Sequence, residues 1–208
     1  MTGSDVTAAV LSSRIVAIVR EKTEDDAKRE AKRLVEAGLR VIEVSLSTPN
    51  ALGVVRWLNE TLPKEGTFFG AGTVLNTDDV KRAAQAGARF IVSPVFSPEM
   101  IDASKELHLV SILGAFTPNE CLAATSAGAD FVKLFPASLW DPSGVRNVMQ
   151  ALPILRLIPT GGVRLNDAAE WMAAGAVAVG LGGTLRSQTS AQELRDAVED
   201  IARPSSGV

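Results

Sequence analysis

The sequence predicts an α/β fold, a (β/α)8 TIM barrel that forms a single domain over residues 1–208. Short apolar segments alternate with segments of helical spacing along the chain, and eight strands can be placed in this way. The strands are apolar on both faces, which is typical of a parallel sheet that is covered by helices. Eight such units suit a closed barrel, and a chain of 208 residues lies at the short end of the range for that fold.

The strands and helices of the first half are each marked by a local pattern. Ile15–Val19 is a continuous apolar run, which predicts a buried strand. Glu24–Ala37 has apolar residues at helical spacing and stops at Gly38, a typical residue at a helix end. The same reasoning predicts a short leading helix at 5–13, strands at 41–45, 68–71 and 90–93, and helices at 49–59, 78–86 and 98–107.

The second half continues the same alternation of strands and helices. Pro118 begins a predicted helix that stops at Gly128, and the strand after it is apolar except for Lys133. The predicted strands are 109–113, 131–134, 155–158 and 177–181, the helices are 118–127, 142–151, 166–174 and 191–202, and a frayed tail covers 204–208.

An open, doubly wound sheet is the alternative arrangement for these elements. That fold binds dinucleotides at a Gly-rich turn after the first strand, and no such turn follows Val19. An internal repeat favours the barrel, because an Ala-Gly pair precedes every second strand. The glycines of these pairs are Gly38, Gly87, Gly128 and Gly175.

When the four segments are aligned on these glycines, one residue of each second strand falls at the same position. These residues are Glu43, Val92, Lys133 and Gly180. Because successive side chains of a strand point to opposite faces, we expect the four to form one of the layers that fill a barrel interior. Strands two and six lie opposite each other in a ring of eight, so Lys133 should face Glu43, and Gly180 should leave room for a small ligand.

A lysine in an apolar barrel interior indicates covalent chemistry. Burial disfavours the ammonium and lowers the pKa of Lys133, and a neutral amine attacks carbonyl carbons to form a Schiff base. Glu43 is then the candidate that moves protons during the reaction. The alternative is a buried Lys–Glu pair that only satisfies itself, although buried ion pairs stabilise proteins poorly and often mark sites.

Two Gly-rich turns follow strands seven and eight, at 159–163 and 180–184. Loops at these two places commonly bind phosphate in this fold, because the N–H groups of glycines ahead of a helix hold an anion. The alternative explanation is a pair of tight turns that need a positive φ.

Arg20 ends strand one and Thr73 follows strand three, so we expect both at the same mouth of the barrel. A guanidinium and a hydroxyl there can hold a substrate carboxylate. The alternative for Arg20 is a solvated position at the rim. Pro94 and Phe135 are expected to shape the wall around Lys133.

Composition argues against several classes of function. The net charge is −3 with both signs interspersed, which argues against nucleic acid or an anionic membrane as a partner. One cysteine and one histidine exclude an internal disulfide and the usual His/Cys zinc site, and we expect no cofactor. Neither a signal peptide nor an apolar run of about 18 residues is present, so we expect a cytoplasmic protein that acts on a small molecule.

The strand around Lys133 resembles the Schiff-base strand of the 2-keto-3-deoxy-6-phosphogluconate (KDPG) / 4-hydroxy-2-oxoglutarate aldolase family. Further motifs of that family occur in the same order along nearly the whole chain, and their combination is specific. In chain order the motifs are Arg40–Ser45, Gly70–Leu75, Ile91–Pro94, Phe131–Pro136, Pro159–Val163 and Gly182–Thr184.

The resemblance implies a class I aldolase, a lyase that needs no metal, in a (β/α)8 barrel that assembles as a homotrimer. Members cleave a phosphorylated 2-keto-3-deoxy sugar acid to pyruvate and glyceraldehyde 3-phosphate. By position in the motifs, Lys133 corresponds to the Schiff-base lysine, Glu43 to the acid/base and Thr73 to a hydroxyl on the pyruvate carboxylate. The phosphate-binding turns correspond to Gly161, Gly162, Gly183 and Thr184.

Ser47 departs from the pattern of some members, which have at that position an arginine that binds the carboxylate. Arg20 is expected to take this role here. KDPG is the expected substrate, and its galactonate epimer or 4-hydroxy-2-oxoglutarate would undergo the same chemistry. A phosphate-binding isomerase or synthase without a covalent step, and a non-catalytic sugar-phosphate-binding barrel, are the alternatives of another class.

Overall fold

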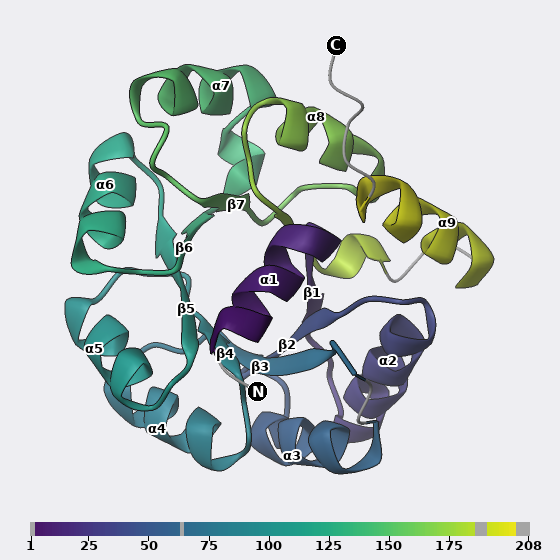
Figure 1. Cartoon of the computed structure of the whole chain (residues 1–208). Helices are drawn as coiled ribbons and strands as arrows, with labels where there is room; N and C mark the ends of the chain where they lie inside the picture. The colour runs from purple at the N-terminus through teal and green to yellow at the C-terminus, as the bar shows by residue number, and fades with distance from the viewer. Residues whose placement is uncertain (1–2, 63–64, 186–190, 203–208) are drawn as a thin grey trace.

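The computed structural model describes residues 3–62, 65–185 and 191–202. Eight parallel strands form a nearly closed barrel with helices around its outside (Figure 1). Neighbouring strands follow the order β7-β6-β5-β4-β3-β2-β1-β8, and an isolated bridge between Thr160 and Gly180 links the two ends. The prediction of a (β/α)8 TIM barrel is confirmed.

The strands lie close to their predicted positions. They are β1 (Ile15–Val19), β2 (Val41–Ser45), β3 (Phe68–Gly72), β4 (Phe90–Val92), β5 (Val110–Ala115), β6 (Phe131–Leu134), β7 (Leu157–Pro159) and β8 (Val179–Leu181). The predicted start of the seventh strand at Leu155 is wrong, because the N–H of Leu155 bonds to the carbonyl of Leu152 in a turn. Leu155 is nevertheless buried, so hydrophobicity alone does not separate it from the strand.

The helices also follow the prediction closely. They are α1 (Gly3–Ser13), α2 (Glu24–Glu36), α3 (Ala51–Thr61), α4 (Thr77–Gln85), α5 (Pro98–Glu106), α6 (Pro118–Ala127), α7 (Pro142–Ala151), α8 (Ala168–Ala173) and α9 (Ala191–Ala202). Short 3-10 turns are η1 (Ala137–Leu139), η2 (Leu165–Asp167) and η3 (Gly183–Leu185), and η2 replaces the predicted first turn of α8. The predicted tail at 204–208 lies outside the described residues.

The repeated Ala-Gly pairs end helices α2, α4, α6 and α8. Each glycine has a positive φ, for example +91° at Gly38 and +106° at Gly175, which is the conformation that a residue with a Cβ adopts with strain. The next residue then donates its N–H back to the last turn, as Leu39 does to Leu34 at 3.0 Å. The repeat thus marks where each helix turns back toward the next strand.

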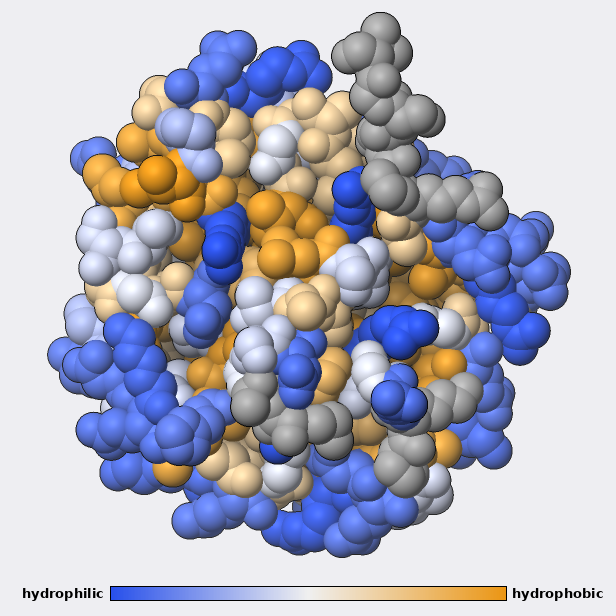
Figure 2. Space-filling view, viewed as in Figure 1, coloured by the Kyte–Doolittle hydropathy of each residue, from blue (hydrophilic) through white to orange (hydrophobic). Residues whose placement is uncertain are grey.

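Helix α1 covers one end of the barrel. Its side chains Val6, Ala9 and Val10 are buried against residues from the inner face of the strands, which include Val16, Val41, Phe68, Phe90, Val110 and Phe131. Figure 1 shows α1 lying across the barrel opening at this end. In the same view, Figure 2 shows a hydrophilic rim over α3 and α4 and hydrophobic surface near α1 and α7.

The larger core lies between the outer faces of the strands and the surrounding helices. It joins strand residues such as Ile42, Leu113 and Val132 to helix residues such as Leu34 and Leu58. Within the described ranges, no helix combines the length and the apolar character needed to cross a membrane.

Candidate active site

Lys133 lies in the middle of β6 and is only 5% exposed. The barrel register places it beside Gly114 of β5 and Ile158 of β7. Its Nζ lies 5.1 Å from the centre of the Phe135 ring, a distance at which an ammonium is attracted to an aromatic face. The lysine of the predicted inner layer is therefore held within the barrel and against an aromatic wall.

Glu43 lies in the middle of β2 and is 2% exposed. Its carboxyl occupies space that Gly72 of β3 leaves open, because a Cβ on Gly72 would lie 2.7 Å from Glu43 Cδ. Glu43 Oε2 is buried and has no hydrogen-bond partner within the described part of the chain. A buried carboxylate oxygen without a partner is costly, and such groups usually have a functional reason.

Burial and neighbouring charges shift the pKa values of both groups. Burial is the main cause that raises the pKa of Glu43, and the positive charges of Lys133 and Arg20 oppose this shift. Burial also lowers the pKa of Lys133, which the charge of Glu43 opposes and the charge of Arg20 reinforces. The two shifts bring a carboxyl and an amine closer to neutrality, the condition for proton transfer and for attack by a lysine.

A cavity of about 340 Å³ opens above Lys133 at the carboxyl ends of the strands. It brings together several residues that the sequence indicated: Arg20, Lys133, Phe135, Gly161, Gly162 and Gly183. Gly180 also lines it, but a Cβ there would lie 2.2 Å from Thr160 Oγ1. Thr160, a buried residue that the sequence did not indicate, therefore lies where a side chain of residue 180 would be, and Gly180 itself borders the cavity.

Not every residue indicated by the sequence lines this cavity: Glu43 and Thr73 are absent from its described lining, although the charge of Glu43 acts on Lys133. Pro94 is not among the described residues that line the cavity; its backbone instead packs against β5, where a Cβ on Gly114 would lie 2.1 Å from the Pro94 carbonyl carbon. Gly114 is the register neighbour of Lys133, and the expected role of Pro94 in the wall around Lys133 stays a prediction. The side chain of Thr184 lies outside the described residues.

Arg20 and Thr73 meet at the mouth of the barrel through a cluster of hydroxyls. Arg20 Nη2 donates to Thr73 Oγ1 at 3.4 Å, and Arg20 Nε donates to Ser45 Oγ at 3.4 Å. Ser45 Oγ lies 2.8 Å from Thr73 Oγ1 and 2.8 Å from Ser47 Oγ. We call Arg20, Ser45, Ser47 and Thr73 the mouth cluster. Ser45 was not predicted as a site residue, because a lone serine in a strand gives little signal.

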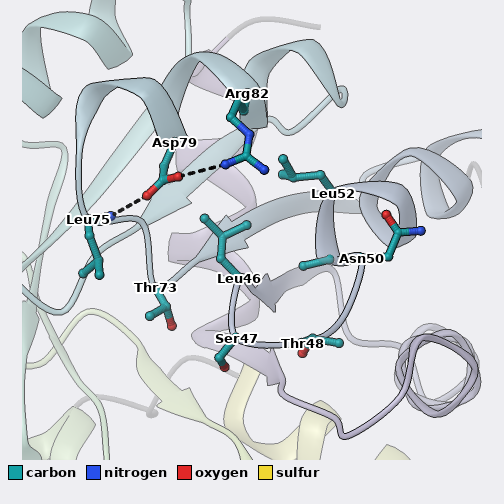
Figure 3. A pocket seen from close by; sticks show the side chains of 10 residues that line it. Leu46, Ser47, Thr48, Asn50, Leu52, Thr73, Leu75, Asp79 and Arg82 are labelled. Carbon is teal, nitrogen blue, oxygen red and sulfur yellow. Dashed lines mark hydrogen bonds and ion pairs between the residues drawn. The ribbon is translucent and has the colours of Figure 1, made fainter.

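A second pocket of about 470 Å³ lies beside the mouth cluster, between the loops after β2 and β3. Figure 3 shows that the hydroxyls of Ser47 and Thr73 point to the same side of this pocket, below Leu46. On its far side Asp79 accepts a hydrogen bond from the N–H of Leu75 and one from Arg82. Asp79 and Arg82 on this side of the pocket therefore pair with each other.

The turn after β7 has glycines with a positive φ. This backbone fits both a phosphate-binding turn and a tight turn without a ligand. Gly161 and Gly162 have φ values of +87° and +93°, so the turn needs residues without a Cβ. The same two glycines line the cavity of Lys133. Among the residues that the structure describes, no group of three or more His, Cys, Asp or Glu is placed to hold a metal ion.

Comparison with known proteins identifies the family. The model of the family described as "KDPG and KHG aldolase" matches residues 6–201. This chain belongs to that family. The chain is therefore an aldolase, a lyase, and its buried Lys133 and Glu43 lie in a barrel of the kind that this family uses.

Individual members of the family resemble most of the chain. A probable 2-dehydro-3-deoxy-6-phosphogalactonate aldolase from Rhizobium meliloti is 37% identical over 172 residues, which cover 82% of this chain and 81% of the relative. A 2-dehydro-3-deoxy-phosphogluconate aldolase from Pseudomonas aeruginosa is 32% identical and covers 77% and 73%. The structure of KDPG aldolase from Legionella pneumophila, with pyruvate as a covalent carbinolamine intermediate, has a TM-score of 0.78 at 25% identity and covers 94% and 95%.

Proposed function

We propose that this protein is a class I aldolase that cleaves a 2-keto-3-deoxy-6-phospho sugar acid to pyruvate and glyceraldehyde 3-phosphate. The observation that supports this most directly is the amine of Lys133, buried at the floor of a cavity with the carboxyl of Glu43 in electrostatic range. The Legionella pneumophila relative supports a covalent step, because a carbinolamine forms when an amine adds to a keto carbon.

In the proposed reaction, the neutral amine of Lys133 adds to C2 of the keto acid, and loss of water gives an imine. Glu43, directly or through a water, takes the proton of the C4 hydroxyl, and the C3–C4 bond breaks. The imine is protonated at this stage, so the electron pair of that bond forms a C2=C3 double bond while the π pair of C=N moves onto nitrogen, which gives a neutral enamine and releases the aldehyde. Glu43 assists protonation of the enamine at C3, and water hydrolyses the imine to pyruvate and free Lys133.

The ends of the substrate are held at opposite sides of the cavity in this proposal. Arg20 and Thr73 bind the carboxylate next to the keto carbon, because they meet at the mouth beside β1 and β3. The N–H groups of Gly161, Gly162 and Gly183 bind the phosphate, with Thr184 adjacent to them in sequence. Phe135 lies beside Lys133, with its ring centre 5.1 Å from Nζ.

A trapping experiment tests the covalent step. The protein is incubated with pyruvate, reduced with borohydride and examined by intact mass and peptide mapping. We expect one reduced pyruvate adduct on the peptide of Lys133, and no adduct and no aldol cleavage in Lys133→Ala. Activity retained by a well-folded Lys133→Ala variant would refute the mechanism, and a phosphate-binding isomerase would then become the leading alternative.

Three substrates of the same chemistry are candidates: KDPG, its galactonate epimer and 4-hydroxy-2-oxoglutarate, and different relatives support the first two individually. KDPG is the substrate expected from the sequence, and the Pseudomonas aeruginosa relative supports it. The galactonate epimer is supported by the Rhizobium meliloti relative, which is more similar to this chain. The epimers differ at C4 and give the same products, so the test runs the reaction backward. The C4 configuration of the compound formed from pyruvate and glyceraldehyde 3-phosphate would separate the two.

We also propose that the protein assembles as a homotrimer through the mouth end of the barrel. Large apolar side chains are exposed in four successive loops after strands β3 to β6, namely Leu75, Val95, Phe116 and Leu139. Exposed apolar residues gathered on one face favour a protein–protein contact. A closed ring of three copies would pair two different parts of this surface at each contact.

A further inference from the structure

Ser45 is the central member of the mouth cluster. It is the last residue of β2 and is fully buried. Its Oγ contacts Arg20 from β1, Ser47 from its own loop and Thr73 from the loop after β3. One hydroxyl therefore links the two groups that the proposed function assigns to the substrate carboxylate.

Counting protons and lone pairs gives these contacts a direction. A hydroxyl has one proton to donate and two lone pairs that accept, whereas a guanidinium only donates. Arg20 therefore donates to both Ser45 and Thr73. If Ser45 gives its own proton to Thr73, both lone pairs of Thr73 are used. The proton of Thr73 is then left for an anion beside Arg20.

The opposite direction would leave the cluster unsuited to an anion. If Thr73 gave its proton to Ser45, the proton of Ser45 would turn toward Ser47, and Thr73 would offer only lone pairs to a ligand. A carboxylate accepts hydrogen bonds and donates none, so its binding selects the first arrangement. In that arrangement Ser45 accepts from Arg20 Nε and from the hydroxyl of Ser47, whose Oγ lies 2.8 Å from Ser45 Oγ.

Thr73 also needs support because of its backbone. It has a φ of +60°, which is uncommon for a residue with a branched Cβ and costs roughly 1–3 kcal/mol. The short contact with Ser45 Oγ, at 2.8 Å, ties this strained residue to the end of β2. The register places Ser45 directly beside Gly72, so the next residue, Thr73, can reach it.

We propose that Ser45 is a positioning residue that orients Arg20 and Thr73 as the binding site for the substrate carboxylate. This inference rests on the proposed aldolase function. Ser45 does not touch the reacting carbons, so its removal should weaken binding of the carboxylate more than it slows bond cleavage.

The test compares Ser45→Ala with Ser45→Thr and Ser93→Ala. Ser45→Thr keeps the hydroxyl. Ser93 is the matched control because it is also fully buried and follows the end of another strand of the barrel, β4, but its Oγ accepts only from the local N–H of Val95 among its described contacts. We expect KM for the keto acid to rise about tenfold or more in Ser45→Ala, with a smaller change in kcat. Ser45→Thr and Ser93→Ala should stay within about threefold of the original protein.

A second readout separates positioning from general damage. Borohydride trapping on Lys133 is measured with pyruvate and with its neutral amide, pyruvamide, at the same pH. Ser45→Ala should need a higher concentration of pyruvate for half-maximal trapping but the same concentration of pyruvamide, because only pyruvate carries the carboxylate. Melting temperatures show whether each variant is folded, and the ratio between the two ligands is independent of the fraction of active protein.

Two results would overturn the role of Ser45. One is an unchanged KM in Ser45→Ala, and the other is an equal loss with pyruvate and pyruvamide, which indicates a purely structural role. Failure of the proposed function gives a different result, because the original protein would then form no adduct with either compound. That outcome would remove the aldolase mechanism and the role of Ser45 with it.

Discussion

At the scale of single residues, charges of opposite sign act on Lys133. Glu43 raises the pKa of the lysine, whereas Arg20 and burial lower it. A protonated amine cannot attack a carbonyl, so imine formation should increase with pH as Lys133 loses its proton. The position of this increase reports the combined effect of burial, which is the largest cause, and of the two neighbouring charges.

Neutralising Glu43 and neutralising Arg20 should shift the pH midpoint of imine formation in opposite directions. Glu43→Gln removes a charge that raises the pKa of Lys133, so half-maximal imine formation should move to lower pH. Arg20→Gln removes a charge that lowers this pKa, so the midpoint should move to higher pH. Trapping of a neutral aldehyde, glycolaldehyde, on the Lys133 peptide across a pH series measures both shifts. Arg20→Lys keeps the charge and should leave the midpoint near that of the original protein; shifts in one common direction would contradict the argument.

Single residues also show what could be predicted from the sequence and what could not. Lys133 and Glu43 were predicted because a charged residue is conspicuous in an apolar strand, and strand alternation gives its direction. Ser45 has no such signal, since a buried serine is common and satisfies itself locally. Only the pairing of β2 with β3 brings it to Thr73, although its position two residues after Glu43 places it on the same face.

At the scale of elements, a glycine of β3 leaves space for a carboxyl group of β2. Gly72 lies where the carboxyl of Glu43 needs space, and any Cβ would come within 2.9 Å of all three carboxyl atoms. Both groups belong to the barrel wall, so neither backbone can retreat without disturbing neighbouring strands. The glycine therefore determines where the carboxylate lies.

Gly72→Ala should displace Glu43 and affect both stability and activity. We expect a loss of about 1–3 kcal/mol in the free energy of unfolding, measured by denaturant titration, and at least a tenfold loss in kcat. Glu43→Asp shortens the side chain by one methylene and should relieve the contact. The double variant should therefore be more stable than the sum of the two single changes implies, and strict additivity would show that the contact is not the cause.

Element boundaries were predictable where a backbone rule applies and less so elsewhere. Gly38, Gly87, Gly128 and Gly175 mark helix ends because each has a positive φ. The start of β7 was placed two residues early, because Leu155 is buried in a turn and looks like strand. The leading helix was predicted as an element, but its place across the barrel end depends on contacts distant in sequence.

At the scale of the whole molecule, the barrel has two ends with different tasks. Helix α1 seals one end with Val6, Ala9 and Val10, and the carboxyl ends of the strands hold Lys133 and its cavity at the other. Stability and chemistry are therefore separated along the barrel axis, which is usual for this fold.

Val10→Ala tests this separation. We expect a loss of about 1–3 kcal/mol in the free energy of unfolding, because a buried side chain is shortened, with kcat unchanged at low temperature. Leu11→Ala on the same helix is the control, since Leu11 is 40% exposed and should change stability by less than about 0.5 kcal/mol. A large change in kcat for folded Val10→Ala would show that the two ends are coupled.

Leu139→Asp tests the proposed trimer. We expect light scattering after size exclusion to give a trimer for the original protein and smaller species for the variant, because a charge would enter an apolar contact. Ile154→Asp is the matched control: Ile154 is also exposed but precedes β7, at the other end of the barrel. A monomeric original protein, or a trimer that survives Leu139→Asp and Val95→Asp together, would refute the proposed interface.

The pairing between β7 and β8 is the shortest between neighbouring strands of the described barrel. Seven neighbouring strand pairs are aligned over two or more residues. Within the described residues, β7 and β8 are linked by one bridge, Thr160 with Gly180, and by one hydrogen bond, from the N–H of Val177 to the carbonyl of Leu157. The turns that would hold the phosphate follow directly on either side of this pairing. A ligand that binds both turns would link β7 to β8. The same contacts would then provide both substrate affinity and resistance to opening of the barrel. The barrel would be stabilised at this place when substrate binds and would lose that stabilisation when product leaves.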